Sequence, residues 1–382
     1  MTIPTVDQLQ RGIALADQIA VREKEITGIL GNHTADPVPA AATHSPAKAG
    51  HGKLMRELAV VCVGAITLGV SAMAANKPAK PEDLAKMEAA LPEKAPATPK
   101  KARKVLVYGN ANGFVHSSIA LGEQTIAKLG EKTGAYASTI TDDPAAFDDL
   151  SGYDAVMLVS CTGHFLLPKV DIGKAPDKAA TDEEKKAFDA KKKEAEGAIA
   201  PYKEKEMQRF DNLLAFVKAG RGLAGIHASS DAYYDWPEWG VVIGGYFNGH
   251  PYHKVTVKID DTKSPITAGF GGKEYPIDDE TYTFKKDPWS RDKLHILTSL
   301  DVTKFTPDDV KKENRPYDHD YGISWIHEYG KGRVFYCAHG HSEHVYSEKP
   351  MLQEYLAGVQ YALGDLDGDA TPSSAPKSDS AK

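Results

Sequence analysis

Histidines gather in three short motifs of this chain, and imidazole is the side chain best suited to proton transfer near neutral pH. The first motif is Gly225-Ile-His227-Ala-Ser-Ser-Asp231, in which a short apolar run ends in a histidine followed by small residues and an acid. The other two motifs are Gly249-His250-Pro251 and His339-Gly340-His341-Ser342-Glu343-His344. The residue types and their spacing predict a site rich in imidazole.

Four residues of these motifs are candidates for acid/base catalysis: His227, Asp231, His250 and His341. His227 follows directly on a predicted buried strand, and open α/β sheets bind their ligands beyond the carboxyl ends of the strands. Asp231 would either orient His227 or cap the next helix. The competing interpretations are a buried, hydrogen-bonded histidine at 227 and an ordinary surface loop at 250.

The same histidines could instead hold a divalent metal such as zinc, which takes three or four ligands of this kind. The candidate ligands are His227, His250 and His341. A metal-free pocket uses the same side chains, so no cofactor follows with certainty from the sequence. The three cysteines include no Cys-x-x-Cys pair, which excludes a cysteine-based structural zinc site and a disulfide framework.

Alternating strand and helix patterns must position these residues. Strands are expected at 105–109, 135–140, 155–160 and 223–226, with helices at 117–132 and 210–219 between them. Later strands are expected at 253–259, 282–284, 295–297, 323–329 and 333–338, with a hairpin at Gly330-Lys-Gly332 and a closing helix at 351–363. Strands that alternate with helices form βαβ units, so an α/β fold with a mainly parallel sheet is predicted over residues 104–364.

The segments outside this domain differ in composition. Residues 1–54 are interpreted as a helical and low-complexity segment, residues 76–103 as a Pro/Lys/Ala-rich linker, and residues 365–382 as a disordered tail. Inside the domain, residues 169–205 have the charge pattern of a helical insertion that lies in solvent.

Residues 55–75 carry the pattern of a secretory signal. A basic flank precedes the apolar run 58–70, which ends in small residues spaced as Ala72-x-Ala74. This pattern is typical of a signal peptide and predicts an exported protein, periplasmic or extracellular. An uncleaved membrane anchor is the alternative, and either Met1 or Met55 could be the start.

A series of short motifs runs in order over residues 104–363. They are Gly113-Phe-Val-His116-Ser117, Gly225-Ile-His227-Ala-Ser-Ser-Asp231 with Trp236, Gly244-Gly245-x-Phe247-x-x-His250-Pro251, Asp279-Glu280-x-Tyr282, Ile323-Ser-Trp325, and Gly332-Arg333-Val-Phe-Tyr336 leading to Gly340-His341. The series resembles the ThuA family of trehalose-utilisation proteins. The resemblance implies a fold like the class I glutamine amidotransferases, itself flavodoxin-like, with helices on both faces of the sheet. It also implies carbohydrate metabolism, with oxidised (3-keto) disaccharides or glucosides as substrates.

A carbohydrate substrate gives roles to further residues near the predicted strand ends. Carboxylates and phenols suit sugar hydroxyls, and aromatic rings stack on sugar rings. The candidate substrate-binding residues are His116, Asn110, Trp236, Glu280 and Tyr282. Core packing is the alternative for Trp236, and an ordinary charged edge strand is the alternative for Glu280 and Tyr282.

Glutamine amidotransfer itself is excluded by the sequence. An amidotransferase of this fold would carry a cysteine nucleophile in a Gly-x-Cys-x-Gly turn, whereas His227 occupies that place here. The expected activity is therefore His-based acid/base hydrolysis or isomerisation of a carbohydrate, and a non-catalytic sugar-binding module is the alternative.

The remaining expectations concern partners. A formal net charge of −7 and the lack of a basic, aromatic-rich run argue against a nucleic-acid partner. A small carbohydrate is the expected ligand, the membrane would be met only through residues 55–75, and a homo-oligomer is left open.

Overall fold

The computed structural model describes residues 76–169, 176 and 180–373. The predictions for residues 1–54, for the signal segment 55–75 and for the end of the tail lie outside the described residues. Among the residues that are described, no helix is long and apolar enough to cross a membrane.

Within the described ranges, nine strands form one sheet in the order β2-β1-β3-β4-β9-β8-β7-β5-β6. Their bounds are β1 Lys104–Tyr108, β2 Ala137–Thr141, β3 Ala155–Val159, β4 Gly222–Ile226, β5 Phe247–Ile259, β6 Tyr275–Phe284, β7 His295–Leu300, β8 Gly322–Tyr329 and β9 Gly332–Cys337. The strands from β2 to β9 pair in parallel, and those from β9 to β6 pair antiparallel. The α/β class is confirmed and the β8–β9 hairpin forms, but the sheet is mixed, so "mainly parallel" is right for only one half.

The two halves differ in burial as well as in direction. Strands β3 and β4 are buried along their whole length, and β1 is buried except at Lys104. Parallel strands covered on both faces need nearly continuous apolar sequence, which these strands have. Strand β5 mixes exposed and buried positions, as an antiparallel strand with one wet face does.

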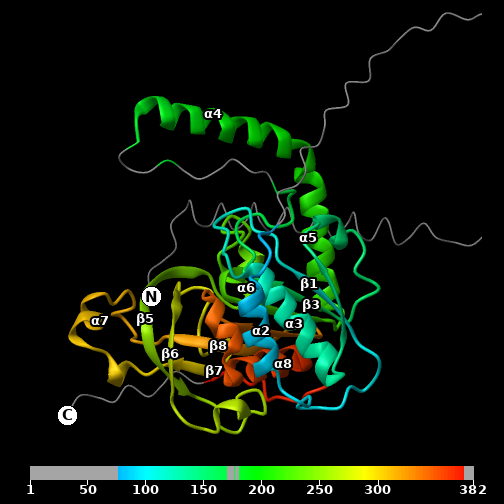
Figure 1. The fold of residues 1–382 in the computed structure, drawn as a ribbon, viewed down its shortest axis with the longest axis vertical. Coiled ribbons are helices and arrows are strands. Elements are labelled where there is room, and N and C mark those ends of the chain that lie inside the picture. The colour runs from blue at the N-terminus through cyan, green and yellow to red at the C-terminus, as the bar shows by residue number, and fades with distance from the viewer. Residues whose placement is uncertain (1–75, 170–175, 177–179, 374–382) are drawn as a thin grey trace, which may run out of the picture. The chain divides into compact units, whose positions relative to one another are not determined.

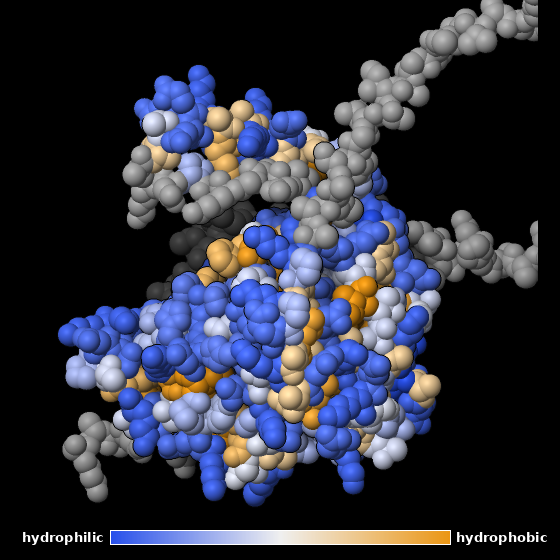
Figure 2. Space-filling model, in the orientation of Figure 1, coloured by the Kyte–Doolittle hydropathy of each residue, from blue (hydrophilic) through white to orange (hydrophobic). Residues whose placement is uncertain are grey.

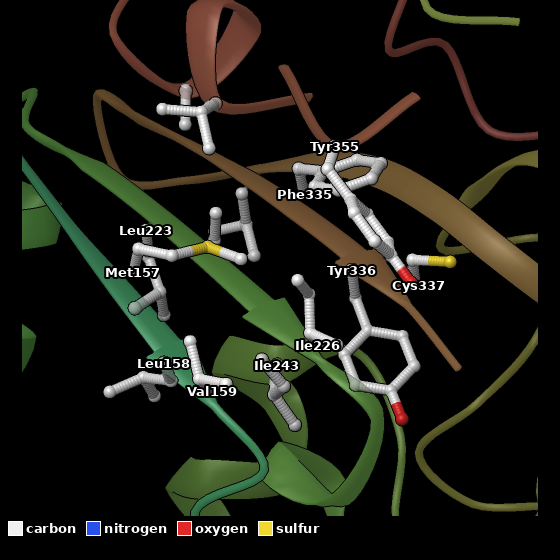
Figure 3. Close-up of a cluster of buried hydrophobic side chains, with 14 of the residues drawn as sticks. Met157, Leu158, Val159, Leu223, Ile226, Ile243, Phe335, Tyr336, Cys337 and Tyr355 are labelled. Carbon is white, nitrogen blue, oxygen red and sulfur yellow. The ribbon is translucent and has the colours of Figure 1, made fainter. Parts of the chain in front are cut away.

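Helices cover both faces of the sheet (Figure 1). They are α2 Pro81–Ala90, α3 Ile119–Thr133, α4 Asp182–Ile199, α5 Lys203–Lys218, α6 Pro237–Ile243, α7 Pro307–Lys311 and α8 Lys349–Ala362. Adjacent side chains of a strand point to opposite faces, and Phe335 of β9 packs on Gly358 of α8 while Tyr336 lies beside Ile243 of α6 across Gly225. Figure 3 shows this core, with Phe335 near Tyr355 and Tyr336 on the side of Ile243.

The segment expected to be a linker, residues 76–103, instead belongs to the folded domain. It contains α2, whose Met87 is fully buried, followed by the buried Leu91. The side chain of Gln360 in α8 accepts from the Ala97 amide at 3.0 Å and donates to the Ala97 carbonyl at 2.7 Å. These contacts fix the segment against α8.

The first residues of the expected disordered tail are also ordered against the domain. Arg103 Nε donates to Asp365 at 2.9 Å, and the side chain of Leu366 is buried. Ser373 donates its backbone N–H to Leu294 at 2.9 Å. The domain therefore runs to Ser373 at least, and not to residue 364.

The charged insertion expected at 169–205 appears as α4 and the start of α5. No residue of α4 is buried, and Figure 2 shows mostly hydrophilic side chains on it. Its first turn is a capping box, in which Thr181 and Glu184 each bond the other's backbone N–H. Helix α5 differs, because Phe210, Leu213 and Val217 bury one of its faces.

Candidate active site

The carboxyl ends of neighbouring parallel strands bring the three histidine motifs to one edge of the sheet. His227 is the first residue after β4, and His341 lies four residues beyond the end of β9, which pairs with β4. His116 lies in the loop after β1, on the same edge. The carboxyl edge is where open α/β sheets hold their ligands.

Four side chains converge there, and we call them the imidazole–carboxylate cluster: His116, His227, Glu280 and His341. His227 Nε2 lies 3.2 Å from His116 Nε2 and 3.3 Å from His341 Nδ1. Glu280 Oε1 lies 3.4 Å from His341 Nδ1 and 3.8 Å from His227 Nε2. All four facing atoms are within 4.8 Å of one another.

His250 forms the solvent-facing end of this arrangement. Its Nδ1 lies 3.3 Å from Glu280 Oε2, and its side chain is 48% exposed. The pairing of β5 with β6 is irregular between Gly249 and Tyr252, and β-bulges of this kind redirect side chains beside active sites. The irregular stretch thus brings His250 to the outer oxygen of Glu280.

The side chain and the backbone of His227 are together held by three neighbours. Its Nδ1 faces the Ala338 carbonyl at 2.8 Å, and since a carbonyl only accepts, Nδ1 carries the proton. The ring of Tyr282 lies against it with centroids 4.2 Å apart, and the Tyr336 hydroxyl donates to the His227 carbonyl. The neutral form of His227 therefore turns the lone pair of Nε2 toward the cluster.

The backbone of His227 is strained. Its φ is +50°, in the left-handed region that residues with a side chain seldom adopt. Such a conformation costs about 1–3 kcal/mol, persists only where the surroundings enforce it, and is concentrated at functional sites. Here it turns the chain sharply after β4 and aims the imidazole at the cluster.

Burial and neighbouring charges give the members of the cluster different pKa values and therefore different protonation states. Burial lowers the pKa of His227 to about 4, and burial together with the other histidines lowers the pKa of His116 to about 2. The hydrogen bond with Glu280 raises the pKa of His341. Burial works to raise the pKa of Glu280, but the neighbouring imidazoles of His341, His250 and His227 together outweigh it and the net shift is downward. Near pH 7 the cluster thus holds two neutral imidazoles and an ionised carboxylate.

Asp279 positions His341, a role that the sequence analysis did not assign to it. Its Oδ2 accepts from the Gly340 amide at 2.8 Å and the His341 amide at 3.3 Å, and its Oδ1 accepts from the Ser342 amide at 2.8 Å. Asp279 is almost fully buried, and a buried carboxylate needs such partners. In the sequence, Asp279 stood only in the Asp279-Glu280-x-Tyr282 motif, ahead of the strand expected at 282–284, and that strand in fact begins at Tyr275.

Three of the expected site residues have other partners. The Asp231 carboxylate accepts from the Tyr234 hydroxyl at 2.6 Å, while Ala338 holds His227 in the place expected for Asp231. Asn110 is buried and donates to the Phe165 and Leu167 carbonyls at 2.7 and 2.9 Å, so it fixes a loop. The ring of Trp236 stacks on Tyr233 at 4.8 Å and packs edge-on against Phe210, which is core packing.

Two other aromatic residues, neither of them predicted, are exposed beside the cluster. Phe114 is 64% exposed, and its ring lies edge-on to His116 with centroids 4.8 Å apart. Tyr234 is 44% exposed, donates to Asp231, and lies under the Lys285 ammonium at 4.3 Å. Both rings face solvent, whereas the ring of Trp236 is partly buried against the core.

Comparison with known proteins gives one family. Residues 178–362 match the model of the ThuA family, described as trehalose utilisation. A putative ThuA-like protein from Bacteroides uniformis is 18% identical (72% of this chain, 98% of that chain, TM-score 0.45). Another from Parabacteroides merdae is 16% identical (72% and 95%, TM-score 0.45), and a cytoplasmic protein from Salmonella typhimurium is 12% identical (69% and 100%, TM-score 0.39). No curated protein matches the sequence.

Proposed function

Because residues 178–362 of this chain belong to the ThuA family of trehalose-utilisation proteins, we propose that it acts on an oxidised (3-keto) disaccharide or glucoside. The reaction takes place at the imidazole–carboxylate cluster and uses acid/base chemistry. The observation that carries the proposal is the convergence of His116, His227, His341 and Glu280 at one sheet edge. His250 connects this cluster to solvent through Glu280.

A ketone makes proton transfer the natural first step on such a sugar. The carbonyl acidifies the neighbouring C–H, so a base in the cluster takes that proton and the electron pair moves onto the ketone oxygen as an enolate. The hydroxyl on the deprotonated carbon then gives its proton to the enolate oxygen, and return of the abstracted proton to the former ketone carbon leaves a ketone at the neighbouring position, which isomerises the sugar. Alternatively, the enolate expels the protonated glycosidic oxygen, and addition of water then completes a net hydrolysis. Positioned acids and bases contribute on the order of a hundred- to ten-thousand-fold to such steps.

The surroundings of the cluster suit a sugar. The exposed rings of Phe114 and Tyr234 can lie against the apolar face of a pyranose, and aromatic side chains present such a face together with a polar tip. Asp231 and Glu280 supply oxygens that accept from sugar hydroxyls. Lys285, above the ring of Tyr234, adds a donor at the rim.

We extend the proposal to the finer fold class, a class I glutamine amidotransferase-like arrangement within the mixed sheet. The sharp turn at His227 supports it, because nucleophiles of related α/β enzymes also stand on a strained strand-to-helix turn. With an imidazole in that place, the turn presents a proton acceptor and not an acyl carrier.

Export stays a proposal that rests on the signal pattern of residues 55–75. Amino-terminal sequencing of protein from the native cell is expected to begin near Ala75. Recovery of Met1 in the membrane fraction would support the anchor instead.

The decisive experiment is product analysis with purified full-length protein and 3-keto-trehalose, with trehalose as the reference compound. Turnover is expected for the ketone and not for trehalose. His250→Ala should reduce the rate by about a hundredfold or more, because the outer acid/base group is lost. His344→Ala, which removes an exposed histidine outside the cluster, is the matched control and should keep the rate.

Two outcomes contradict the catalytic proposal. Saturable binding of the keto-sugar without any product would favour the sugar-binding module. Neither binding nor turnover of any keto-glucoside by the folded protein would remove carbohydrate chemistry from this site.

A further inference from the structure

We propose that His116, His227, His341 and Glu280 form a binding site for one divalent transition-metal ion, with zinc as a fitting occupant. The set differs from the one that the sequence suggested, because His116 and Glu280 take part and His250 does not. Metal binding can be measured without any sugar, so this inference stands or falls independently of the proposed function.

Four of the six separations between the facing atoms are close to those in a coordination shell, and all six lie within 4.8 Å. Zinc–nitrogen bonds of about 2.0–2.1 Å place the ligand atoms of a tetrahedron roughly 3.3 Å apart. The distances from His227 Nε2 to His116 Nε2 and to His341 Nδ1 are 3.2 and 3.3 Å. Those from Glu280 Oε1 to His341 and His227 are 3.4 and 3.8 Å.

The second nitrogen of His227 has the partner that metal-ligating histidines usually have. Such histidines donate their other ring N–H to a carboxylate or backbone carbonyl, which fixes the tautomer and orients the lone pair. His227 does so with the Ala338 carbonyl at 2.8 Å. The remaining nitrogen, Nε2, is the atom that faces the other three ligands.

The other ligands are also held from outside the cluster. Asp279 binds the backbone that carries His341, and His250 faces the outer oxygen of Glu280 at 3.3 Å. Hydrogen bonds of this kind to ligating groups tune and preorganise metal sites. The ligands come from β6 and from the segments after β1, β4 and β9, which the sheet fixes relative to one another.

His116 turns only its Nε2 toward the cluster, so this atom is the one available to a metal, while its Nδ1 lacks the partner that the second nitrogen of His227 has. Its ring is buried, and its Nδ1 has no hydrogen-bond partner in the described part of the chain. The Nε2 of His116 faces His227, so the ring has polar contact only on the side of the cluster. A single hydrogen bond between two imidazoles would satisfy this pair but would not require His341 and Glu280 to converge on the same point.

The donor set selects the class of ion. Three imidazole nitrogens and one carboxylate oxygen suit zinc and its neighbours among the first-row transition metals. Magnesium and calcium prefer shells made of oxygen alone. Magnesium is therefore the appropriate negative probe.

The test is metal binding to the purified full-length protein after treatment with a chelator. Titration calorimetry and elemental analysis should give one zinc per chain, and magnesium in tenfold excess should not displace it. His116→Gln, His341→Ala and Glu280→Gln should each weaken zinc binding by about a hundredfold or more, since outer-shell changes alone cost 10- to 100-fold. Zinc should raise the melting temperature of the wild-type protein and not that of these variants.

Two variants serve as controls. His344→Ala removes an exposed histidine close in sequence and should bind zinc like the wild type. His250→Ala should retain one zinc per chain, with affinity reduced at most about tenfold, because among the four proposed ligands His250 pairs with the outer oxygen of Glu280. Loss of stoichiometry in His250→Ala would restore the ligand set suggested by the sequence and contradict the present one.

Anomalous diffraction at the zinc edge locates the ion directly and is expected to show it among the four ligand atoms. The inference is overturned if the folded wild type binds no zinc. It is equally overturned if zinc binds unchanged in all three ligand variants, or if the anomalous peak lies elsewhere.

Discussion

His227 Nε2 and His341 Nδ1 lie 3.3 Å apart although 114 residues separate them in the sequence. They meet because β4 and β9 are neighbours that run in parallel, so both chains leave the sheet at the same edge. Between them in sequence lie the antiparallel strands β5 to β8, which fold back and add Glu280 from the side. The cluster is thus assembled from both halves of the mixed sheet.

Replacement of Asp279 tests its role as the residue that positions His341. Asp279→Ala removes the acceptor of three backbone amides, and buried amides left unpaired should lower the free energy of unfolding by about 2–4 kcal/mol. Urea denaturation measures the effect. Asp278→Ala, which changes an exposed neighbour with a loose surface ion pair to Lys254, should cost less than about 1 kcal/mol. Equal losses in the two variants would contradict the assignment.

Gly340→Ala should displace His341 through the backbone. Gly340 has a φ of +130°, and a Cβ there would lie 2.6 Å from Ile226 and 2.8 Å from the Tyr346 hydroxyl. We expect a loss of about 2 kcal/mol or more in stability, together with weaker zinc binding. Gly152→Ala, where a Cβ would meet nothing, is the control. Unchanged zinc affinity in Gly340→Ala would show that the loop tolerates the shift.

Glu354 should make stability depend on pH. Burial raises the pKa of this carboxyl to about 7, so the folded chain keeps a proton that the unfolded chain releases at its ordinary pKa of 4.5. The associated stability is therefore fully present below about pH 4.5 and is lost as the pH rises through 7. Relative to wild type, Glu354→Gln should gain on the order of 3 kcal/mol between pH 4.5 and 8 in urea titrations. Parallel pH profiles for the two proteins would show that Glu354 titrates normally.

Substitution of the exposed aromatic residues should weaken sugar binding without lowering the stability of the fold. Phe114→Ala and Tyr234→Ala are expected to raise KM for the keto-sugar by about tenfold and to leave the melting temperature nearly unchanged. Trp236→Ala should do the reverse, with a loss of about 2–4 kcal/mol in stability, because its ring packs on Tyr233 and Phe210. A raised KM in a stable Trp236→Ala protein would return Trp236 to the substrate site.

Local sequence was enough to predict the α/β class, the strand exits and three of the four cluster residues as neighbours. Buried parallel strands have nearly continuous apolar sequence, and polar residues placed directly after them reach one edge by the geometry of the sheet alone. His227 follows β4 directly, whereas His341 and His116 lie in loops that leave β9 and β1 at the same edge of the sheet.

The roles of Glu280, Asp279 and His250 depended on tertiary structure. These residues lie on the antiparallel strands β5 and β6, and their positions follow from strand pairing and from an irregular register that no local pattern specifies. Asn110 and Trp236 have partners within the protein that the sequence did not predict, since the direction of a side chain at a loop or helix start is set by the packing around it.

At the ends of the domain, too, local sequence and tertiary structure give different information. The composition of residues 76–103 is typical of a linker, because a few apolar residues among prolines and lysines give no periodic signal. In the folded protein Met87 and Leu91 are buried in the core, and Gln360 binds the chain at Ala97. The sequence by itself determined which segments form strands and which polar side chains follow those strands at the edge of the sheet. Only the tertiary structure decided which side chains meet, because those contacts depend on residues far apart in the chain.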